Sequence, residues 1–180
     1  MNMTIDGFVA DINGQLDWML PETDEKQKQY LNGLTKSIDT ILLGKKMATE
    51  AIPHWEEVAQ AKQQDPEVEF ANIFVKTPKI IYSKSMRSFE GKNVSIENGD
   101  LKASVGELKD QAGKDIITYG GANFAASLLE QNLIDELHLF VHPVSLGKGL
   151  AIFKSKLKFE LVRSDSYSNG IVLHKYKPKG

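Results

Sequence analysis

Four short apolar runs recur along the chain and are separated by stretches of helical periodicity. The runs are Asp39–Leu43, Lys79–Ser83, Asp115–Tyr119 and Glu136–His142. Continuous apolar runs of this length are typical of strands buried on both faces of a parallel sheet. The last third differs, because Lys158–Asp165 and Ile171–Lys177 resemble strands joined through Asn169-Gly170, a strong hairpin signal. We predict an α/β fold, with a mixed, mostly parallel central sheet flanked by helices and ending in an antiparallel C-terminal hairpin.

Helices are expected between these strands. Asp24–Ser37 is amphipathic, and Phe124 begins a second stretch with helical spacing. Ser104 and Glu107 have the spacing of a capping box and predict a helix start at that serine. Ala48–Val75 is predicted to be helical on both sides of a break near Asp65-Pro66.

Composition narrows the class of protein. With 180 residues, 41% hydrophobic and 26% charged, the chain fits one globular domain spanning residues 1–180. Cysteine is absent, which excludes disulfides, thiolate metal sites and a cysteine nucleophile. The net charge is −2 with scattered basic residues, so nucleic acid is not an expected partner. Apolar runs fall far short of the roughly 20 residues that span a bilayer, and we expect a cytoplasmic protein without a membrane segment.

The most informative local motif runs from Tyr119 to Asn123, between a predicted strand and a predicted helix. Gly120 and Gly121 would let a ligand approach the backbone, and the free N–H groups of the following helix would suit a phosphate. A tight turn without a ligand explains the motif equally well. The G-x-G-x-x-G pattern of dinucleotide-binding Rossmann folds is absent.

Two other predicted strand ends carry similar residues. Gly44-Lys45-Lys46 follows one strand and Ser83-Lys84-Ser85 follows another. Ligands of open α/β sheets bind beyond the carboxyl ends of the strands, so these residues could hold phosphates, including the additional one of NADPH. Solvated surface lysines are the alternative.

The N-terminal segment contains candidate acids. Asp6 and Asp24 could relay a proton to a substrate nitrogen, although Asp24 could instead cap its helix. Trp18 could stack on a flat ring or simply pack its loop. His138 and His142 are interpreted as polar positions on a strand face, and no zinc-ligand spacing, zinc-deaminase signature or serine-hydrolase elbow is present. We therefore predict no metal site.

Asp115–Phe153 resembles the C-terminal signature of the riboflavin-biosynthesis reductase domain, within the wider dihydrofolate reductase-like group. The features that carry the resemblance are the double glycine, Ile134–Leu137, Pro143-Val144 and the Gly147-x-Gly149 ending. Thr4–Ala10 resembles the opening motif of this family and Pro78–Ser85 its central strand. The resemblance covers nearly the whole chain and is weakest between Thr49 and Asn72.

The resemblance implies NADPH as cofactor, a small-molecule substrate and a homodimer. It assigns the diphosphate to Gly120, Gly121, Ala122 and Asn123, a further phosphate contact to Gly44 and Lys45, and the adenosine 2′-phosphate to Ser83 and Lys84. The nicotinamide would lie near Thr4, Val9 and Ala10, and the substrate near Asp6, Trp18, Thr23 and the start of the Asp24 helix. Leu137, Leu139 and Val141 could serve an interface or the core.

Some positions depart from the family pattern. Thr23 stands where dihydrofolate reductases carry their substrate-binding acid, which argues against folate reduction. Lys45 replaces an arginine, which removes a two-pronged contact, and Met47 replaces a phosphate-facing threonine. The first strand is shorter than in relatives, so either it is truncated or the natural start lies upstream of Met1.

We therefore predict an NADPH-dependent reductase that transfers a hydride to a small nitrogen heterocycle: a pteridine, a pyrimidine or a ribosylaminopyrimidine. Asp6 and Asp24 are its candidate catalytic residues, with water as the alternative proton source. Lys45 and Lys84 favour NADPH over NADH. The alternatives are a genuine dihydrofolate reductase and a catalytically silent nucleotide-binding module.

Overall fold

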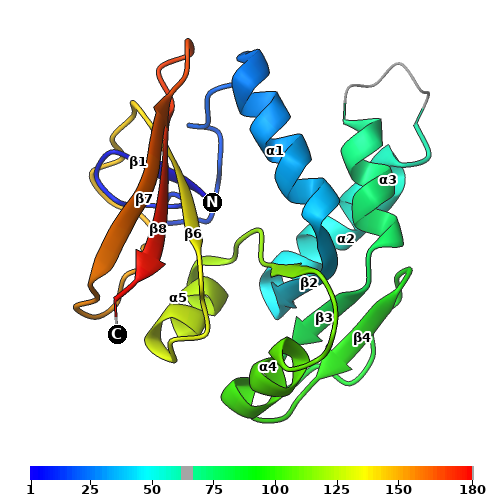
Figure 1. Ribbon diagram of the computed structural model, residues 1–180. Coiled ribbons are helices and arrows are strands. Elements are labelled where there is room, and N and C mark those ends of the chain that lie inside the picture. The colour runs from blue at the N-terminus through cyan, green and yellow to red at the C-terminus, as the bar shows by residue number, and fades with distance from the viewer. Residues whose placement is uncertain (62–66, 180) are drawn as a thin grey trace. The chain divides into compact units, whose positions relative to one another are not determined.

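A computed structural model of the protein describes residues 1–61 and 67–179 (Figure 1). The chain forms two compact units, which are described separately below. Unit 1 comprises Met1–Tyr30 and Ala122–Gly180, and unit 2 comprises Leu31–Gly121. Helix α1 (Glu25–Ser37) begins in unit 1 and ends in unit 2.

Unit 2 contains a four-stranded, fully parallel sheet in the order β4-β3-β2-β5. Its strands are β2 (Ile38–Gly44), β3 (Lys79–Tyr82), β4 (Val94–Glu97) and β5 (Asp115–Ile117). The helices within this unit are α2 (Lys45–Val58), α3 (Val68–Lys76) and α4 (Leu101–Lys109). This alternation of strand and helix is the pattern that the apolar runs predicted.

The central strand β2 explains why its sequence is continuously apolar. Ile41 and Leu43 are 0% exposed and Leu42 is 4% exposed, so both faces of the strand are covered. Ile41 and Leu43 belong to a core cluster that also contains buried residues of α2, α3 and β3, namely Ala48, Ile52, Phe74 and Ile81. Burial of side chains on both faces is what favours a parallel sheet here.

The first residue of β3 is a lysine that is buried against the C-terminus of α3. Lys79 is 1% exposed, and its Nζ donates to the carbonyl oxygens of Phe74 (2.9 Å), Val75 (3.1 Å) and Thr77 (2.8 Å). The ammonium group thus satisfies carbonyls at the C-terminus of a helix, which intrahelical bonds leave unpaired. Burial lowers the pKa of Lys79 to about 8.

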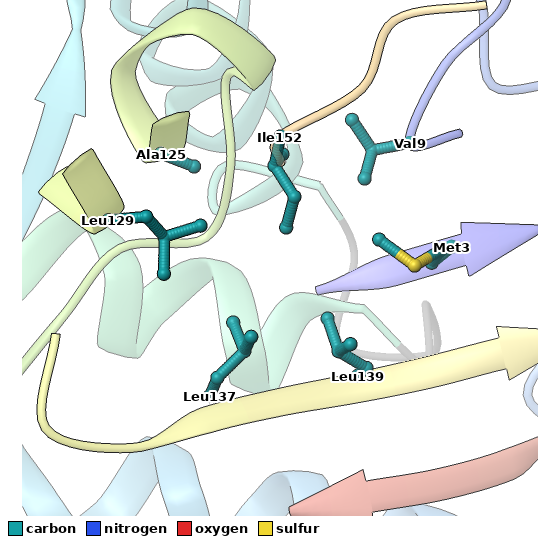
Figure 2. Packing of buried hydrophobic residues seen from close by; sticks show 7 residues of the cluster. All are labelled: Met3, Val9, Ala125, Leu129, Leu137, Leu139 and Ile152. Carbon is teal, nitrogen blue, oxygen red and sulfur yellow. The ribbon is translucent and has the colours of Figure 1, made fainter. Parts of the chain in front are cut away.

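Unit 1 contains a mixed sheet in the order β1-β6-β8-β7, in which only β1 and β6 are parallel. Its elements are β1 (Asn2–Thr4), β6 (Leu137–His142), β7 (Phe159–Ser166), β8 (Val172–Pro178) and helix α5 (Ala122–Glu130). Figure 2 shows the core, in which side chains of β1, β6, α5 and two loops converge. Its buried members are Met3, Val9, Ala125, Leu129, Leu137, Leu139 and Ile152.

The predicted fold class is confirmed, with a parallel sheet, flanking helices and a C-terminal antiparallel strand pair, although the strands fall into two sheets of four. Leu137 and Leu139 are core residues rather than interface residues. The predicted capping box at Ser104 is wrong: α4 begins earlier, and the Oδ1 of Asp100 accepts from the Ala103 N–H. Strand β4 was not predicted, because four alternating residues at a sheet edge give a weak signal. The predicted break at Asp65-Pro66 lies outside the described residues.

No helix within residues 1–61 and 67–179 is both long enough and apolar enough to cross a membrane.

Candidate functional site

The carboxyl ends of the parallel strands in unit 2 meet at one edge of the sheet. Gly44, Tyr82 and Glu97 are register partners at this edge, in β2, β3 and β4 respectively. Helix α2 begins directly after Gly44, which has an extended backbone (φ −77°, ψ 157°) and no side chain that could cap the helix. The first turn of α2 contains Lys45 and no acidic residue. The backbone N–H groups of this turn and the positive end of the helix dipole therefore remain available to an anion.

The loop after β3 lies against the start of α2. Lys45 Nζ donates to the Ser85 hydroxyl at 3.3 Å. The Ser83 hydroxyl accepts from the backbone N–H groups of Ser85 (3.3 Å) and Met86 (3.0 Å), which fixes the turn. Lys84 Nζ donates to the carbonyl oxygen of Gly99 at 2.7 Å. Both lysines are exposed, and an ammonium group that makes one such bond retains two further donors.

Asn98 joins the same edge. Its Nδ2 donates to the carbonyl oxygens of Ser83 and Met86, the latter at 3.0 Å, and thereby ties the loops after β3 and β4 together. Sequence reasoning missed this residue, because an isolated asparagine after an unpredicted edge strand carries no recognisable signal.

The double glycine follows β5 at this edge. Gly120 and Gly121 have positive φ angles of 155° and 85°, which favour glycine. A Cβ atom on Gly120 would lie 3.1 Å from Cε of Met47, so the first turn of α2 approaches the backbone here. Ala122 and Asn123 continue the segment as the first residues of α5, with Asn123 exposed. The structure thus brings Gly44, Lys45, Ser83, Lys84 and Gly120 to one edge of unit 2, as predicted from the strand ends.

In unit 1, a hydrogen-bonded turn holds the predicted acid Asp6. The buried Thr4 hydroxyl donates to Asp6 Oδ1 at 2.5 Å and accepts from the Phe8 N–H at 3.0 Å. Asp6 Oδ2 accepts from three donors of residues 145–147: the Ser145 hydroxyl (2.7 Å), the Leu146 N–H (3.0 Å) and the Gly147 N–H (2.7 Å). The bonds from the hydroxyls and these N–H groups hold the pKa of Asp6 far below its ordinary value. A carboxylate in this state fastens two loops together and is a poor proton donor at neutral pH.

Val9 and Ala10 pair with the loop that follows Pro143. The Val9 N–H donates to the Leu150 carbonyl oxygen and the Leu150 N–H donates to the Ala10 carbonyl oxygen, both at 2.8 Å. A Cβ atom on Gly149 would lie 2.3 Å from the Ala10 carbonyl oxygen, so only glycine allows this approach. The Val9 side chain belongs to the core of Figure 2.

Asp24 caps α1, so the alternative interpretation of this residue as a helix cap is confirmed. Its Oδ1 accepts from the N–H groups of Lys26 (2.8 Å) and Gln27 (3.2 Å), and its Oδ2 accepts from the Ser168 N–H (2.8 Å) and hydroxyl (2.7 Å). These bonds, led by those from Ser168, lower the pKa of Asp24 to about 2. The carboxyl is therefore ionised at neutral pH. The neighbouring Thr23 is exposed.

Trp18 and His142 contact each other in unit 1. Trp18 is 8% exposed and meets the His142 ring edge-on, with centroids 5.3 Å apart and an interplanar angle of 84°. Trp18 thus packs its loop. His142 is a polar residue of strand β6, as the sequence indicated, but its burial (1% exposed) and its hydrogen bonds through both ring nitrogens were not predicted. Its partners lie about 120 residues or more away in the chain, where sequence spacing gives no signal.

Within the described part of the chain, no group of three or more His, Cys, Asp or Glu residues is arranged to hold a metal ion.

Comparison with known proteins identifies the family to which the chain belongs. The RibD C-terminal domain family matches residues 1–173. An uncharacterised Bacillus subtilis protein, YyaP, is 30% identical over 174 residues, covering 94% of this chain and 88% of that protein. A putative riboflavin biosynthesis protein from a Shewanella species has a similar structure, with a TM-score of 0.75, 20% identity and coverage of 100% of this chain and 97% of the other.

A Thermotoga maritima protein described as a deaminase and 5-amino-6-(5-phosphoribosylamino)uracil reductase gives a TM-score of 0.68 at 17% identity. The match covers 99% of this chain but 55% of that one. At this level of identity the structural likenesses establish the fold. The family match over nearly the whole length establishes more: the chain belongs to the RibD C-terminal domain family.

Proposed function

We propose that the protein is an NADPH-dependent reductase that transfers a hydride to a small nitrogen heterocycle, with a ribosylaminopyrimidine as the first substrate to test. Membership of the RibD C-terminal domain family supports a reductase, and related proteins are described as acting in riboflavin biosynthesis. The substrate suggestion comes from the uracil reductase named for the Thermotoga protein.

The observation that carries the cofactor proposal is the carboxyl edge of the unit 2 sheet. An uncapped helix start at Gly44, the exposed ammonium groups of Lys45 and Lys84, and a double glycine with positive φ all lie at strand ends of one sheet. These donors fit the phosphates of a dinucleotide, and the two cations favour the extra phosphate of NADPH. NADPH supplies the hydride when it is bound.

The residues of unit 1 are assigned by resemblance. The nicotinamide would be held by the backbone around Thr4, Val9 and Ala10, and the substrate would meet Trp18 and the region of Thr23. Asp6 and Asp24 remain predicted catalytic residues that no comparison tests. Their hydrogen bonds argue for a structural role, because each carboxylate accepts at least four hydrogen bonds and stays ionised. We therefore propose water as the source of any proton that the reaction needs.

We also propose a homodimer, from the resemblance, and a cytoplasmic location, from the sequence pattern. The edge strand β7 is compatible with self-association, since Leu161 and Val162 are 52% and 48% exposed. Light scattering of the purified protein would test the dimer.

The direct test is isotope transfer. The protein is incubated with NADPH deuterated at C4 and with the ribosylaminopyrimidine, a pteridine or dihydrofolate, and the product is examined by mass spectrometry. Deuterium in the pyrimidine product supports the proposal, and deuterium in tetrahydrofolate would instead indicate a dihydrofolate reductase. Cofactor binding without transfer to a C=N or sugar carbon of any of these substrates would indicate the silent nucleotide-binding module, which the engagement of both predicted acids favours as second candidate.

A further inference from the structure

His142, the last residue of β6, is hydrogen-bonded through both ring nitrogens. The Leu20 N–H lies 3.1 Å from Nδ1, and Asn2 Oδ1 lies 3.0 Å from Nε2. A backbone N–H can only donate, so Nδ1 must be the unprotonated nitrogen. The proton is then on Nε2 and is donated to Asn2. The two bonds therefore select one neutral tautomer of the ring.

These bonds connect three segments that are distant in the chain. Asn2 belongs to β1, His142 to β6, and Leu20 to the segment Trp18–Leu20, which has no strand or helix of its own. The edge-on contact between Trp18 and His142 adds a second link between that segment and β6. His142 is thus positioned to decide where Trp18 lies.

The held position of Trp18 has a cost. Its indole N–H is buried and finds no acceptor within the described residues. A buried donor without a partner is destabilising, and it would regain a hydrogen bond to water if the segment moved outward. Other contacts of the segment must offset this cost, and the hydrogen bond from Leu20 to His142 is one that joins it to β6.

We propose that His142 is a positioning residue, which latches the segment Trp18–Leu20 to the end of β6 and thereby places Trp18 for the substrate of the reductase. The role of Trp18 toward substrate rests on the proposed function. The latch itself is a property of unit 1 and can be tested without any ligand.

The latch requires neutral histidine. An imidazolium carries a proton on both nitrogens, so Nδ1 could no longer accept from Leu20. Asn2, Trp18 and Leu20 bring no titratable side chain to the ring, and the titratable group that acts on it is the amino group of Met1, whose own pKa burial lowers to about 5. Burial, and to a smaller extent that amino group, lower the pKa of His142, so the latch is expected to hold at neutral pH and to open in acid.

Two conservative variants separate the two bonds. His142→Asn keeps an oxygen near the position of Nδ1 and can still accept from Leu20, whereas His142→Gln keeps a polar group near Nε2 and loses that acceptor. Amide hydrogen exchange of Leu20 should accelerate about tenfold or more in His142→Gln and change little in His142→Asn. In the wild type the protection of the Leu20 amide, taken relative to its intrinsic exchange rate at each pH, should fall as the pH falls through the titration of His142, and His142→Asn should remove that dependence.

Two spectroscopic readouts complete the test. Nitrogen-15 NMR of labelled histidine should show Nδ1 unprotonated and Nε2 protonated at neutral pH. In a Trp55→Phe background, which leaves Trp18 as the one tryptophan, emission should shift to the red in His142→Gln as the indole meets water. A proton on Nδ1, or unchanged Leu20 exchange in a folded His142→Gln protein, would overturn the latch.

The proposed placement of Trp18 for the substrate is tested separately, by enzyme kinetics. With an active reductase, His142→Gln should raise KM for the heterocycle several-fold while KM for NADPH stays unchanged, and His142→Asn should restore it. An unchanged substrate KM in a protein whose latch is open would overturn the placement of Trp18. A working latch in a protein that reduces no heterocycle would contradict the proposed function and leave the latch intact.

Discussion

The two units assemble their candidate sites in different ways. In unit 2 the polar groups follow the strands that position them: Lys45 comes directly after β2, and Ser83 directly after β3. In unit 1 they depend on partners far away in the chain, since Asp6 binds residues 145–147 and Asp24 binds Ser168. A parallel sheet brings successive strand ends to one edge automatically, whereas a turn fastened by long-range hydrogen bonds must be closed by specific pairs.

The comparison predicts that unit 1 is the more sensitive to a change at a single long-range contact. Gly149→Ala would place a Cβ atom 2.3 Å from the Ala10 carbonyl oxygen, which forces the two backbones apart. We expect a loss of about 3 kcal/mol in the free energy of unfolding, typical of overpacking. Denaturant unfolding measures the loss, and hydrogen exchange should show it first in unit 1. If Gly149→Ala were as stable as the wild type, the close approach of Gly149 to the Ala10 carbonyl oxygen would be contradicted.

Unit 2 should depend most on a local polar contact. Lys79→Met removes the donor of three carbonyl oxygens that lie within five residues of it. We expect a loss of about 2 kcal/mol, because hydrogen bonds from a charged group contribute more than neutral ones. Lys76→Met changes an exposed lysine in the last turn of α3. It is the matched control and should have little effect on stability. Equal effects of the two variants would show that burial of Lys79 is unimportant.

Acid should affect unit 1 before unit 2. Among the residues that the structure describes, the carboxyls with clearly lowered pKa values all lie in unit 1, namely Asp6, Asp11, Asp24 and Glu136. A carboxyl whose pKa is lower in the folded than in the unfolded state stabilises the fold above the unfolded pKa of about 4. That stabilisation is lost progressively as the pH falls further. Hydrogen exchange as a function of pH should show unit 1 opening first, and Asp24→Asn should weaken the pH dependence. If unit 2 opened at a higher pH than unit 1, the prediction that unit 1 is the more sensitive to acid would be wrong.

The smallest expected effect is a gain in stability. Gly106 lies inside α4, and a Cβ atom there would meet nothing within 4 Å. Gly106→Ala should stabilise the protein by about 0.5–1 kcal/mol, because alanine loses less backbone entropy in a helix. Thermal unfolding measures the gain. A loss of stability would mean that α4 contributes to unit 2 through contacts that this glycine alone permits.

The difference between the units also decides what the sequence can predict. Continuous apolar runs such as Ile41–Leu43 predict buried parallel strands, and the residues that follow them predict the edge of unit 2. His142 and Ser168 could not be predicted as partners of Leu20 and Asp24, because no local pattern specifies contacts over about 120 to 144 residues. The capping box at Ser104 failed for a related reason: the residue types fit, but Asp100 offered the same bond one turn earlier.

We propose above that the carboxyl edge of unit 2 binds the phosphates of NADPH. The affinities of the wild type and of Lys45→Ala/Lys84→Ala for NADPH and NADH would test it most directly, followed by nicotinamide fluorescence. Lys102→Ala, an exposed lysine on α4, serves as control. We expect the wild type to prefer NADPH, and the double variant to lose about tenfold or more in affinity for NADPH but far less for NADH. Equal losses for both cofactors, or no binding of either by the wild type, would contradict it.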